Sequence, residues 1–153
     1  MIFLRLAHEP DLLLMLAWRS NPLIFEGFYS QEQPLVWQEH LDWFRSRNED
    51  WRTFIIELVE DDTPRPVGVV TIGQMDYWEP ETGIYVGEVS LWSKGIGKQA
   101  LRQAIDYLKQ KGYKYTRTTI LDSNERSIKL YLSLGFKRIG EARPGESLYR
   151  KEL

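Results

Sequence analysis

Two glycines mark the point where a strand-like stretch meets an amphipathic helix, in the run Trp92-Ser93-Lys94-Gly95-Ile96-Gly97-Lys98. The backbone N–H groups in the first turn of a helix lack intrahelical partners and lie at the positive end of the helix dipole. Glycines leave these donors open, so the spacing predicts a site for phosphate oxygens. The same residues also fit a tight strand-to-helix turn that binds no ligand.

Two common phosphate loops fit this run poorly. A P-loop needs glycine five residues before its Gly-Lys pair and Ser or Thr after the lysine, whereas this chain has Trp92 and Gln99 at those positions. Gly95-x-Gly97-x-x-Ala100 does match the dinucleotide fingerprint. That fingerprint normally opens the first βαβ unit, however, and here too little chain follows it for a doubly wound sheet.

A second motif lies downstream, in residues 124–136, which read NERSIKLYLSLGF. It resembles the Asn-x-x-Ser/Ala-x-x-Leu-Tyr-x-x-Leu-Gly-Phe pattern of the GNAT superfamily of acyl-CoA-dependent N-acyltransferases. Residues 92–97 are similar to the Trp-Gly/Asn-Lys-Gly-Tyr/Ile-Ala/Gly loop of a subgroup that includes ribosomal-protein N-terminal acetyltransferases. The two motifs stand in the proper order. The resemblance implies acetyl-CoA as co-substrate, with its pyrophosphate at the glycine turn, and no metal.

The resemblance also implies which residues bind acetyl-CoA. Backbone N–H groups at the glycine turn would receive the pyrophosphate, namely those of Lys94, Gly95, Ile96, Gly97, Lys98 and Gln99. The free backbone groups of Val89, Ser90 and Leu91, at the end of a splayed strand, would bind the pantetheine amides and polarise the thioester. Asn124 and Ser127 match motif positions, and Asn124 is expected to contact the cofactor arm, although its residue type also suits a helix N-cap.

Tyr131 and Glu88 are the candidates for proton transfer. Tyr131 matches the motif tyrosine, and because a phenol stays protonated at neutral pH it can donate to the departing thiolate; its alternative role is packing beside Phe136. Glu88 precedes the glycine turn, where related enzymes often carry a basic carboxylate. Deprotonating an ammonium group with a carboxylate is uphill unless burial raises the carboxyl pKa, so a water relay is the alternative. His8 and His40 have no partner pattern for metal binding, and we interpret both as structural or peripheral.

The N-terminal third gives the only indication of the acceptor. Trp18-Arg19-Ser20-Asn21, His40 and Trp43-Phe44 resemble the Trp-Arg-Asn … His-x-x-Trp-Phe pattern of acetyltransferases that act on nucleotide-linked amino sugars. We therefore expect a small-molecule primary amine, preferably a nucleotide-linked amino sugar. A protein N-terminus, an aminoglycoside or a polyamine is the alternative acceptor, and a non-catalytic acyl-CoA-binding module is the alternative function. Four carboxylates are candidates for binding a cationic substrate from the loops: Glu26, Asp76, Glu79 and Glu81.

The hydrophobic periodicity predicts the elements that hold these residues. We expect strands over 2–6, 53–59, 66–75, 83–91, 113–121, 136–141 and 147–153, and helices over 9–19, from Pro34, over 95–111 and over 125–133. This order predicts one mixed α/β domain over residues 1–153. The resemblance implies a mostly antiparallel central sheet, splayed at the acyl-CoA site and flanked by about four helices.

Composition excludes several other classes of protein. The chain has 153 residues, of which 42% are hydrophobic and 27% charged, as in ordinary globular domains. A net charge of -2 argues against nucleic-acid or anionic-membrane partners, and the absence of cysteine excludes disulfides and thiolate sites. No stretch resembles a signal peptide or approaches transmembrane length, so we expect a cytoplasmic location. Homodimers are common in the superfamily, and the resemblance allows one here.

Overall fold

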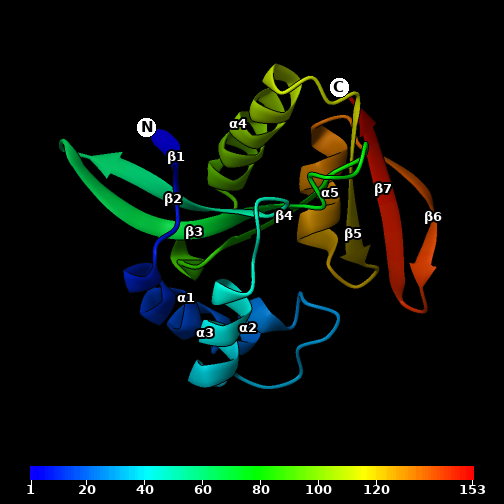
Figure 1. Cartoon of the computed structure of the whole chain (residues 1–153). Coiled ribbons are helices and arrows are strands. Elements are labelled where there is room, and N and C mark those ends of the chain that lie inside the picture. The colour runs from blue at the N-terminus through cyan, green and yellow to red at the C-terminus, as the bar shows by residue number, and fades with distance from the viewer.

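The computed structural model describes residues 1–153 and contains one seven-stranded sheet with helices on both faces (Figure 1). The strands are β1 (Ile2–Leu6), β2 (Arg52–Glu60), β3 (Thr63–Gly73), β4 (Glu81–Val86), β5 (Tyr115–Leu121), β6 (Lys137–Arg143) and β7 (Glu146–Glu152). The helices are α1 (Leu12–Arg19), α2 (Pro22–Phe25), α3 (Trp37–Arg45), α4 (Ile96–Gln110) and α5 (Glu125–Ser133), with 3₁₀ turns at Glu9–Asp11 and Val89–Leu91. The predicted mixed α/β class is confirmed.

The strand order is β1-β2-β3-β4-β5-β7-β6, and every neighbouring pair is antiparallel except β4 and β5. That parallel pair is joined at only one register position, Glu81 opposite Arg117. A parallel pair requires a crossover, which α4 supplies. The sheet therefore divides into a β1–β4 half and a β5–β7 half that separate beyond Glu81.

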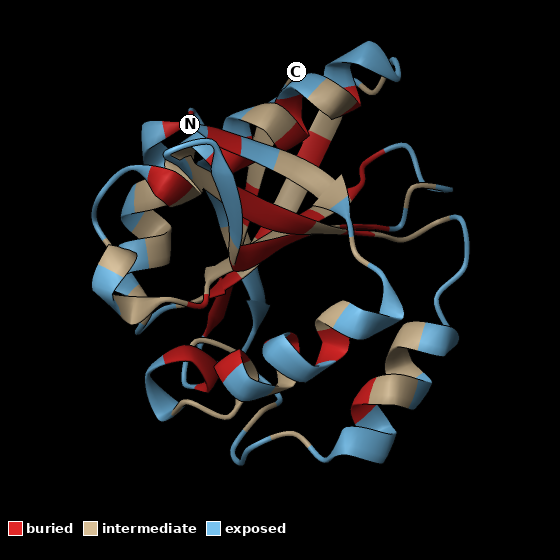
Figure 2. Cartoon of the chain, turned by 90° about the vertical axis from the view of Figure 1, so that its left-hand side faces the viewer, coloured by how far each residue is buried: buried red, intermediate tan, exposed pale blue.

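Helices α4 and α5 cover one face of the sheet, and α1–α3 cover the other (Figure 1). On β4 and its neighbour β3, Val70 and Ile84 pack toward α4, while Val69 and Tyr85 pack toward α1 and α2. Figure 2 shows this burial concentrated on the central strands and on the inward sides of the helices. Burying each large aliphatic side chain contributes about 1.5–3 kcal/mol, so the two faces together hold the site rigidly.

Helix α2 adds a fifth helix to the four that the sequence predicted. Asn21 and Pro22, which follow the helix predicted over 9–19, begin a short new helix. The Asn21 side chain accepts a hydrogen bond from the Leu23 backbone N–H at 3.0 Å, and Pro22 occupies the first turn. A capping asparagine followed by proline is a strong helix start. No helix of the chain combines the length and hydropathy needed to span a bilayer.

The predicted strand over 83–91 is wrong at its C-terminal end. β4 stops at Val86, and Val89–Leu91 forms a 3₁₀ turn in which the Leu91 N–H donates to the Glu88 carbonyl at 2.9 Å. Gly87 permits the change of direction, since a Cβ there would lie 2.2 Å from the Trp18 ring. The apolar residues Val89 and Leu91 stand two positions apart, as in a strand, but both lie in this 3₁₀ turn.

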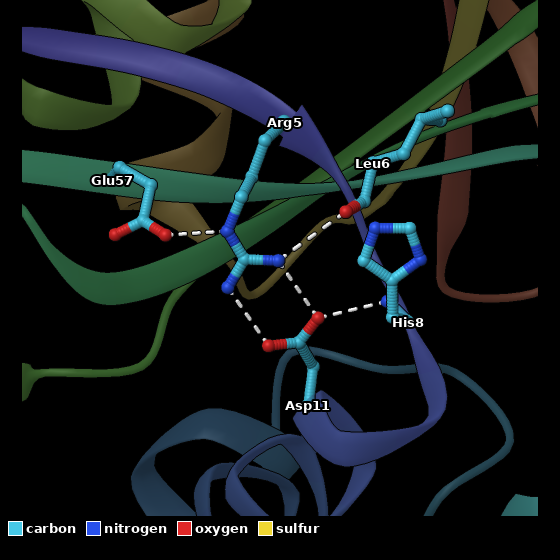
Figure 3. A network of polar contacts seen from close by, with 5 residues as sticks. All are labelled: Arg5, Leu6, His8, Asp11 and Glu57. Carbon is cyan, nitrogen blue, oxygen red and sulfur yellow. Dashed lines mark hydrogen bonds and ion pairs between the residues drawn. The ribbon is translucent and has the colours of Figure 1, made fainter.

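A polar network fixes β1 against α1 and β2 (Figure 3). The Arg5 guanidinium donates to both Asp11 carboxylate oxygens at 2.8 Å and, through Nε, to Glu57 at 2.5 Å. Asp11 also accepts from the His8 backbone N–H at 2.8 Å. These contacts hold the pKa of Asp11 below its usual range, chiefly through the Arg5 hydrogen bond. The network sets where α1 begins, and α1 in turn carries residues of the cleft described next.

Candidate active site

A cleft of about 820 Å³ opens where β4 and β5 separate. One wall comes from α1, the loop before α3, and β4; the other comes from the start of α4, β5 and α5. The cleft includes Tyr85, which faces α1–α3, and Tyr131, which belongs to the α4–α5 layer. It therefore connects the two faces of the sheet through the gap between its halves.

The splay leaves part of the β4 edge without a strand partner. The Thr118 hydroxyl donates to the Thr82 carbonyl at 2.8 Å, and the Trp92 indole donates to the Val86 carbonyl at 2.8 Å. Backbone groups alternate in direction along a strand, so the N–H and C=O of Ile84 point the same way as those of Thr82 and Val86. Ile84 thus presents both groups to the gap, which an extended amide-containing ligand can fill.

The glycine turn exposes donors at the start of α4. Ser93 and Gly95 have left-handed backbones, with φ of 61° and 83°. No backbone carbonyl accepts from the N–H groups of Ile96, Gly97 or Lys98, whereas the Gln99 N–H is already bonded to the Gly95 carbonyl at 3.1 Å. Successive N–H groups at a helix start form an anion-binding concavity, so the predicted phosphate site is available at the first three of these positions.

Cationic side chains surround this turn. Lys98, Arg126 and Lys129 line the cleft, and none of them forms an ion pair within the chain. The Arg126 guanidinium carbon lies 3.3 Å from the centre of the Trp92 ring. Partial burial lowers the pKa of Arg126, which reflects the cost of holding its charge without a counter-ion. Phosphate groups are suited to neutralise such a cluster.

Tyr131 lies at the bottom of the gap. Its side chain is buried, its ring packs edge-on against Phe136 at 4.8 Å between centroids, and its hydroxyl donates to the Thr82 carbonyl at 3.4 Å. Burial raises the pKa of Tyr131 to about 12, so the phenol is fully protonated at neutral pH. The long hydrogen bond leaves this hydroxyl free to turn toward a closer acceptor.

The carboxylates of the cleft are Glu81 and Glu146. Burial raises the pKa of Glu81, and the Arg117 charge opposes that rise. Glu146 is buried and accepts from Arg143 at 2.9 Å, so its charge is already paired. Glu88, the base predicted from sequence, does not line the cleft; its half-exposed carboxylate lies 4.0 Å from Arg65. Glu81 is therefore the carboxylate of the cleft whose charge no ion pair neutralises.

The other half of the cleft combines aromatic rings with a partly buried cation. The Arg19 guanidinium carbon lies 3.6 Å from the centre of the Phe28 ring and 5.9 Å from that of Tyr85. His40, which we interpreted as structural or peripheral, is buried in this wall and stacks on Trp43 at 5.6 Å between ring centroids. Rings of this kind suit the flat faces of a sugar or base.

The loop between α2 and α3 reaches across the gap to the β5–β7 half. A Cβ on Gly27 would lie 3.0 Å from the Asn124 amide nitrogen, and the Arg143 guanidinium carbon lies 3.6 Å from the centre of the Tyr29 ring. Asn124 also accepts from the Ser127 backbone N–H at 3.3 Å, which confirms its N-cap role. The loop thus closes one end of the cleft.

Most, but not all, of the predicted site residues meet in this cleft. Those in its wall are Leu91, Gly95, Ile96, Gly97, Lys98, Asn124, Ser127 and Tyr131. Those outside it are Glu88, Val89, Ser90, Lys94 and Gln99. The open strand edge lies at Ile84 instead of Val89–Leu91, because β4 ends earlier than predicted.

Several residues that line the cleft were missed because no local signal reveals them. Arg126 and Lys129 lie on the helix predicted over 125–133, and Glu146 lies one residue before the strand predicted over 147–153. Glu81 was expected in a loop, whereas it is the first residue of β4. A strand predicted to end at Gly87 would have placed Ile84 at the open edge, because residues alternate in direction along a strand with a period of two.

Comparison with known proteins agrees with this geometry. The profile of the Acetyltransferase (GNAT) domain family matches residues 2–137. The uncharacterised protein MJ1062 of Methanocaldococcus jannaschii is 45% identical over 154 residues, covering 99% of this chain; this chain spans only 31% of that protein's length. The crystal structure of a domain from Methanocaldococcus jannaschii DSM 2661 has a TM-score of 0.97 at 44% identity, covering 100% of this chain and 99% of the other.

Two enzymes with solved structures share the fold. An N-acetyltransferase from Staphylococcus aureus Mu50 has a TM-score of 0.80 at 26% identity, covering 99% of this chain and 98% of the other. Spermidine N-acetyltransferase from Vibrio cholerae, solved with CoA and spermine, has a TM-score of 0.84 at 16% identity, covering 99% and 94%. Because the family profile covers most of the residues, and the splayed sheet holds both sequence motifs in one cleft, this chain belongs to the GNAT acetyltransferase domain family.

Proposed function

We propose that the domain is an acetyl-CoA-dependent N-acetyltransferase that acts on the primary amine of a small molecule. One observation supports this most. Three features face the same cleft: the open edge of β4 at Ile84, the unpaired backbone N–H of Gly97 and the Tyr131 hydroxyl. Each feature matches one part of a thioester co-substrate. A binding module that performs no reaction would not need a buried phenol beside the gap.

The chain offers acetyl-CoA a continuous set of contacts. The N–H groups of Ile96, Gly97 and Lys98 would bind the pyrophosphate, and Arg126 would add positive charge. The N–H and C=O of Ile84 would pair with the pantetheine amides as an added strand does. A backbone N–H of this edge would also polarise the thioester carbonyl, where negative charge develops during attack by the amine.

Tyr131 would stabilise the departing sulfur. A thiol has a pKa near 8.5 and Tyr131 one of about 12, so complete transfer of the phenolic proton to a thiolate is uphill. The phenol must therefore regain a proton in the same step. The nitrogen of the tetrahedral intermediate carries one proton too many, and it would return that proton to Tyr131 as the C–S bond breaks.

Glu81 would prepare the acceptor amine. An amine is protonated at neutral pH and attacks only after losing a proton, which a nearby carboxylate can accept. Burial raises the pKa of Glu81 and so makes it a stronger base than an exposed carboxylate. A water relay from the amine through Glu81 to solvent is the alternative route.

We retain a nucleotide-linked amino sugar as the preferred acceptor. His40 and Trp43, which belong to the N-terminal pattern of such enzymes, both line the cleft and stack on each other. A protein N-terminus, an aminoglycoside or a polyamine is the alternative. The Vibrio cholerae neighbour, solved with spermine, represents the polyamine case.

Thiol release from acetyl-CoA in the presence of these four acceptor classes tests the proposal. We expect release that depends on the amine and saturates with it. If the protein binds CoA and no amine accelerates thiol release above the buffer rate, the domain is a binding module and the catalytic assignment fails.

A further inference from the structure

The aromatic half of the cleft also holds a cation without a counter-ion. Arg19 ends α1, and no ion pair of the chain includes it. Its Nε donates to the Gln31 side-chain oxygen at 2.7 Å, and Phe28 covers one face of the guanidinium at 3.6 Å. Nη1 and Nη2 donate to no protein group. The outer edge of the guanidinium is thus the part left for a ligand.

A second unsatisfied donor lies beside it. The Tyr85 hydroxyl is buried and has no hydrogen-bond partner, although the Tyr85 ring lies 5.9 Å from the Arg19 guanidinium carbon. A buried polar group without a partner costs free energy, and so does a partly buried charge without a counter-ion. Two such donors in one wall of a cleft are explained together if a ligand supplies an anionic acceptor to both.

The Arg19 side chain is held in place before any ligand arrives. The Gln31 amide nitrogen donates to the Arg19 carbonyl at 2.7 Å and to the Gln33 carbonyl at 2.9 Å. The guanidinium therefore has a fixed orientation, and its Nη edge presents the parallel N–H groups that bind carboxylate or phosphate in pairs. Burial lowers the pKa of Arg19, which an incoming anion would reverse.

The separation from the reacting centre restricts the ligand. Glu81 and Tyr85 lie four residues apart on β4, on the same face, which is about 13 Å along the strand at ~3.3 Å per residue. An amine near Glu81 and an anion near Tyr85 therefore belong to opposite ends of an extended molecule. An α-amino acid carries both groups on one carbon and does not span this distance.

We propose that the acceptor carries an anionic group, a phosphate or a carboxylate, that Arg19 and Tyr85 bind at a distance from the reacting amine. The proposal rests on the N-acetyltransferase function above and names its substrate class. A polyamine has no group for Arg19 and would leave its charge unpaired. The aromatic rings of Phe28 and Tyr85 are then packing surfaces for the part of the acceptor that carries the anion.

Two matched pairs of acceptors test this class and distinguish its two sources. Glucosamine 6-phosphate, whose amine and phosphate lie at opposite ends of the sugar, against glucosamine isolates a phosphate, and 6-aminohexanoate against hexylamine isolates a carboxylate. We expect the anionic member of at least one pair to have a kcat/KM about 10- to 100-fold higher in the wild-type protein, mainly through KM. The pair with the larger ratio identifies the source of the anion.

Substitution of Arg19 shows whether this side chain causes the preference. We expect Arg19→Gln to bring the ratio close to one and Arg19→Lys to retain part of it. If Arg19 had a purely structural role, its substitution would lower kcat/KM equally for both acceptors of a pair. The ratio of the two kcat/KM values is therefore insensitive to partial unfolding. Arg45→Gln removes an exposed arginine that pairs with Glu9 outside the cleft, and it should leave the ratio unchanged.

Calorimetric binding of glucosamine 6-phosphate and 6-aminohexanoate to the CoA-saturated protein supplies a readout that needs no turnover. CoA occupies the glycine turn in this experiment, so a phosphate cannot bind there instead. Weaker binding in Arg19→Gln supports the proposal even if no acceptor is acetylated, in which case only the catalytic assignment fails. The anion site is overturned if kcat/KM is equal for the two acceptors of each pair. It is also overturned if both anionic acceptors bind equally to the wild-type protein and to Arg19→Gln. Neither result would contradict acetyl transfer itself.

Discussion

The Tyr131 hydroxyl donates to the Thr82 carbonyl at 3.4 Å, one residue beyond the last position at which β4 pairs with β5. The phenol therefore lies where the sheet begins to open. Thr82 also accepts from the Thr118 hydroxyl at 2.8 Å, so its carbonyl keeps a partner when Tyr131 turns away. This arrangement lets Tyr131 exchange a weak internal contact for a stronger one to sulfur.

Replacing Tyr131 by phenylalanine should lower kcat by about 10²-fold, the usual effect of losing a group that transfers a proton in the transition state. The KM for acetyl-CoA should stay within about twofold, because the ring and its packing on Phe136 remain. Steady-state kinetics check this. Tyr107→Phe is the matched control, since Tyr107 lies outside the cleft on α4. An unchanged kcat in Tyr131→Phe would remove the phenol from the mechanism.

Glu81→Gln should reduce kcat/KM by about 10²-fold if this carboxylate accepts the amine proton. Burial raises the pKa of Glu81 above 4.5, and the basic form is the deprotonated one. The wild-type rate should therefore rise with pH as Glu81 loses its proton, and this ascending limb should be absent in Glu81→Gln. Glu88→Gln distinguishes the two candidate bases: a large loss there, with Glu81→Gln unaffected, would restore Glu88 to the role predicted from sequence.

Gly95→Ala should weaken acetyl-CoA binding and destabilise the fold together. Gly95 has φ of 83° and no atom within 4 Å of an added Cβ, so the cost comes from the left-handed backbone, about 1–2 kcal/mol. Gly112 at the end of α4 has φ of 91° and equally open surroundings. Gly112→Ala should lower the melting temperature similarly while the Kd for CoA stays unchanged. Equal Kd values in the two variants would show that the turn does not hold the pyrophosphate.

Asp11→Asn should reduce the free energy of unfolding by about 1–3 kcal/mol at neutral pH, because Arg5 loses its bidentate partner. The folded state lowers the pKa of Asp11, so the stabilisation is present above its ordinary value of 3.8 and is lost as pH falls through the lower folded value. Urea titrations at neutral and acid pH should therefore show that the difference in free energy of unfolding between the wild-type protein and Asp11→Asn becomes smaller at acid pH. Glu9→Gln, at an exposed ion pair, should change stability little at either pH.

The sequence was sufficient to predict the parts of the site that depend on local order. The 3.6-residue spacing of Ile96, Ala100, Leu101 and Leu108 predicted α4, and all four are buried. Gly95 at its start predicted the turn, and Gly95 adopts a left-handed backbone there. Tyr131 followed from the motif that contains it, and its helix carries it into the gap.

The remaining parts depend on tertiary contacts that no local pattern encodes. Gly87 bends the chain out of β4 because Trp18, sixty-nine residues earlier, occupies the space of a side chain (87 − 18). Arg19 belongs to the N-terminal pattern, but only the packing of Phe28 and Tyr85 around it makes it a partly buried cation. Glu81 becomes a candidate base through burial, which is a property of the assembled cleft.

The most direct test of the central claim follows the acetyl group itself. The protein is incubated with acetyl-CoA that carries an isotopic label in the acetyl group and with the best acceptor from the amine panel, and the products are separated by mass spectrometry. We expect the label to appear as an amide on the acceptor nitrogen, at a rate that Tyr131→Phe reduces. Label that stays in the thioester, or that appears only as free acetate while CoA is bound, would contradict it.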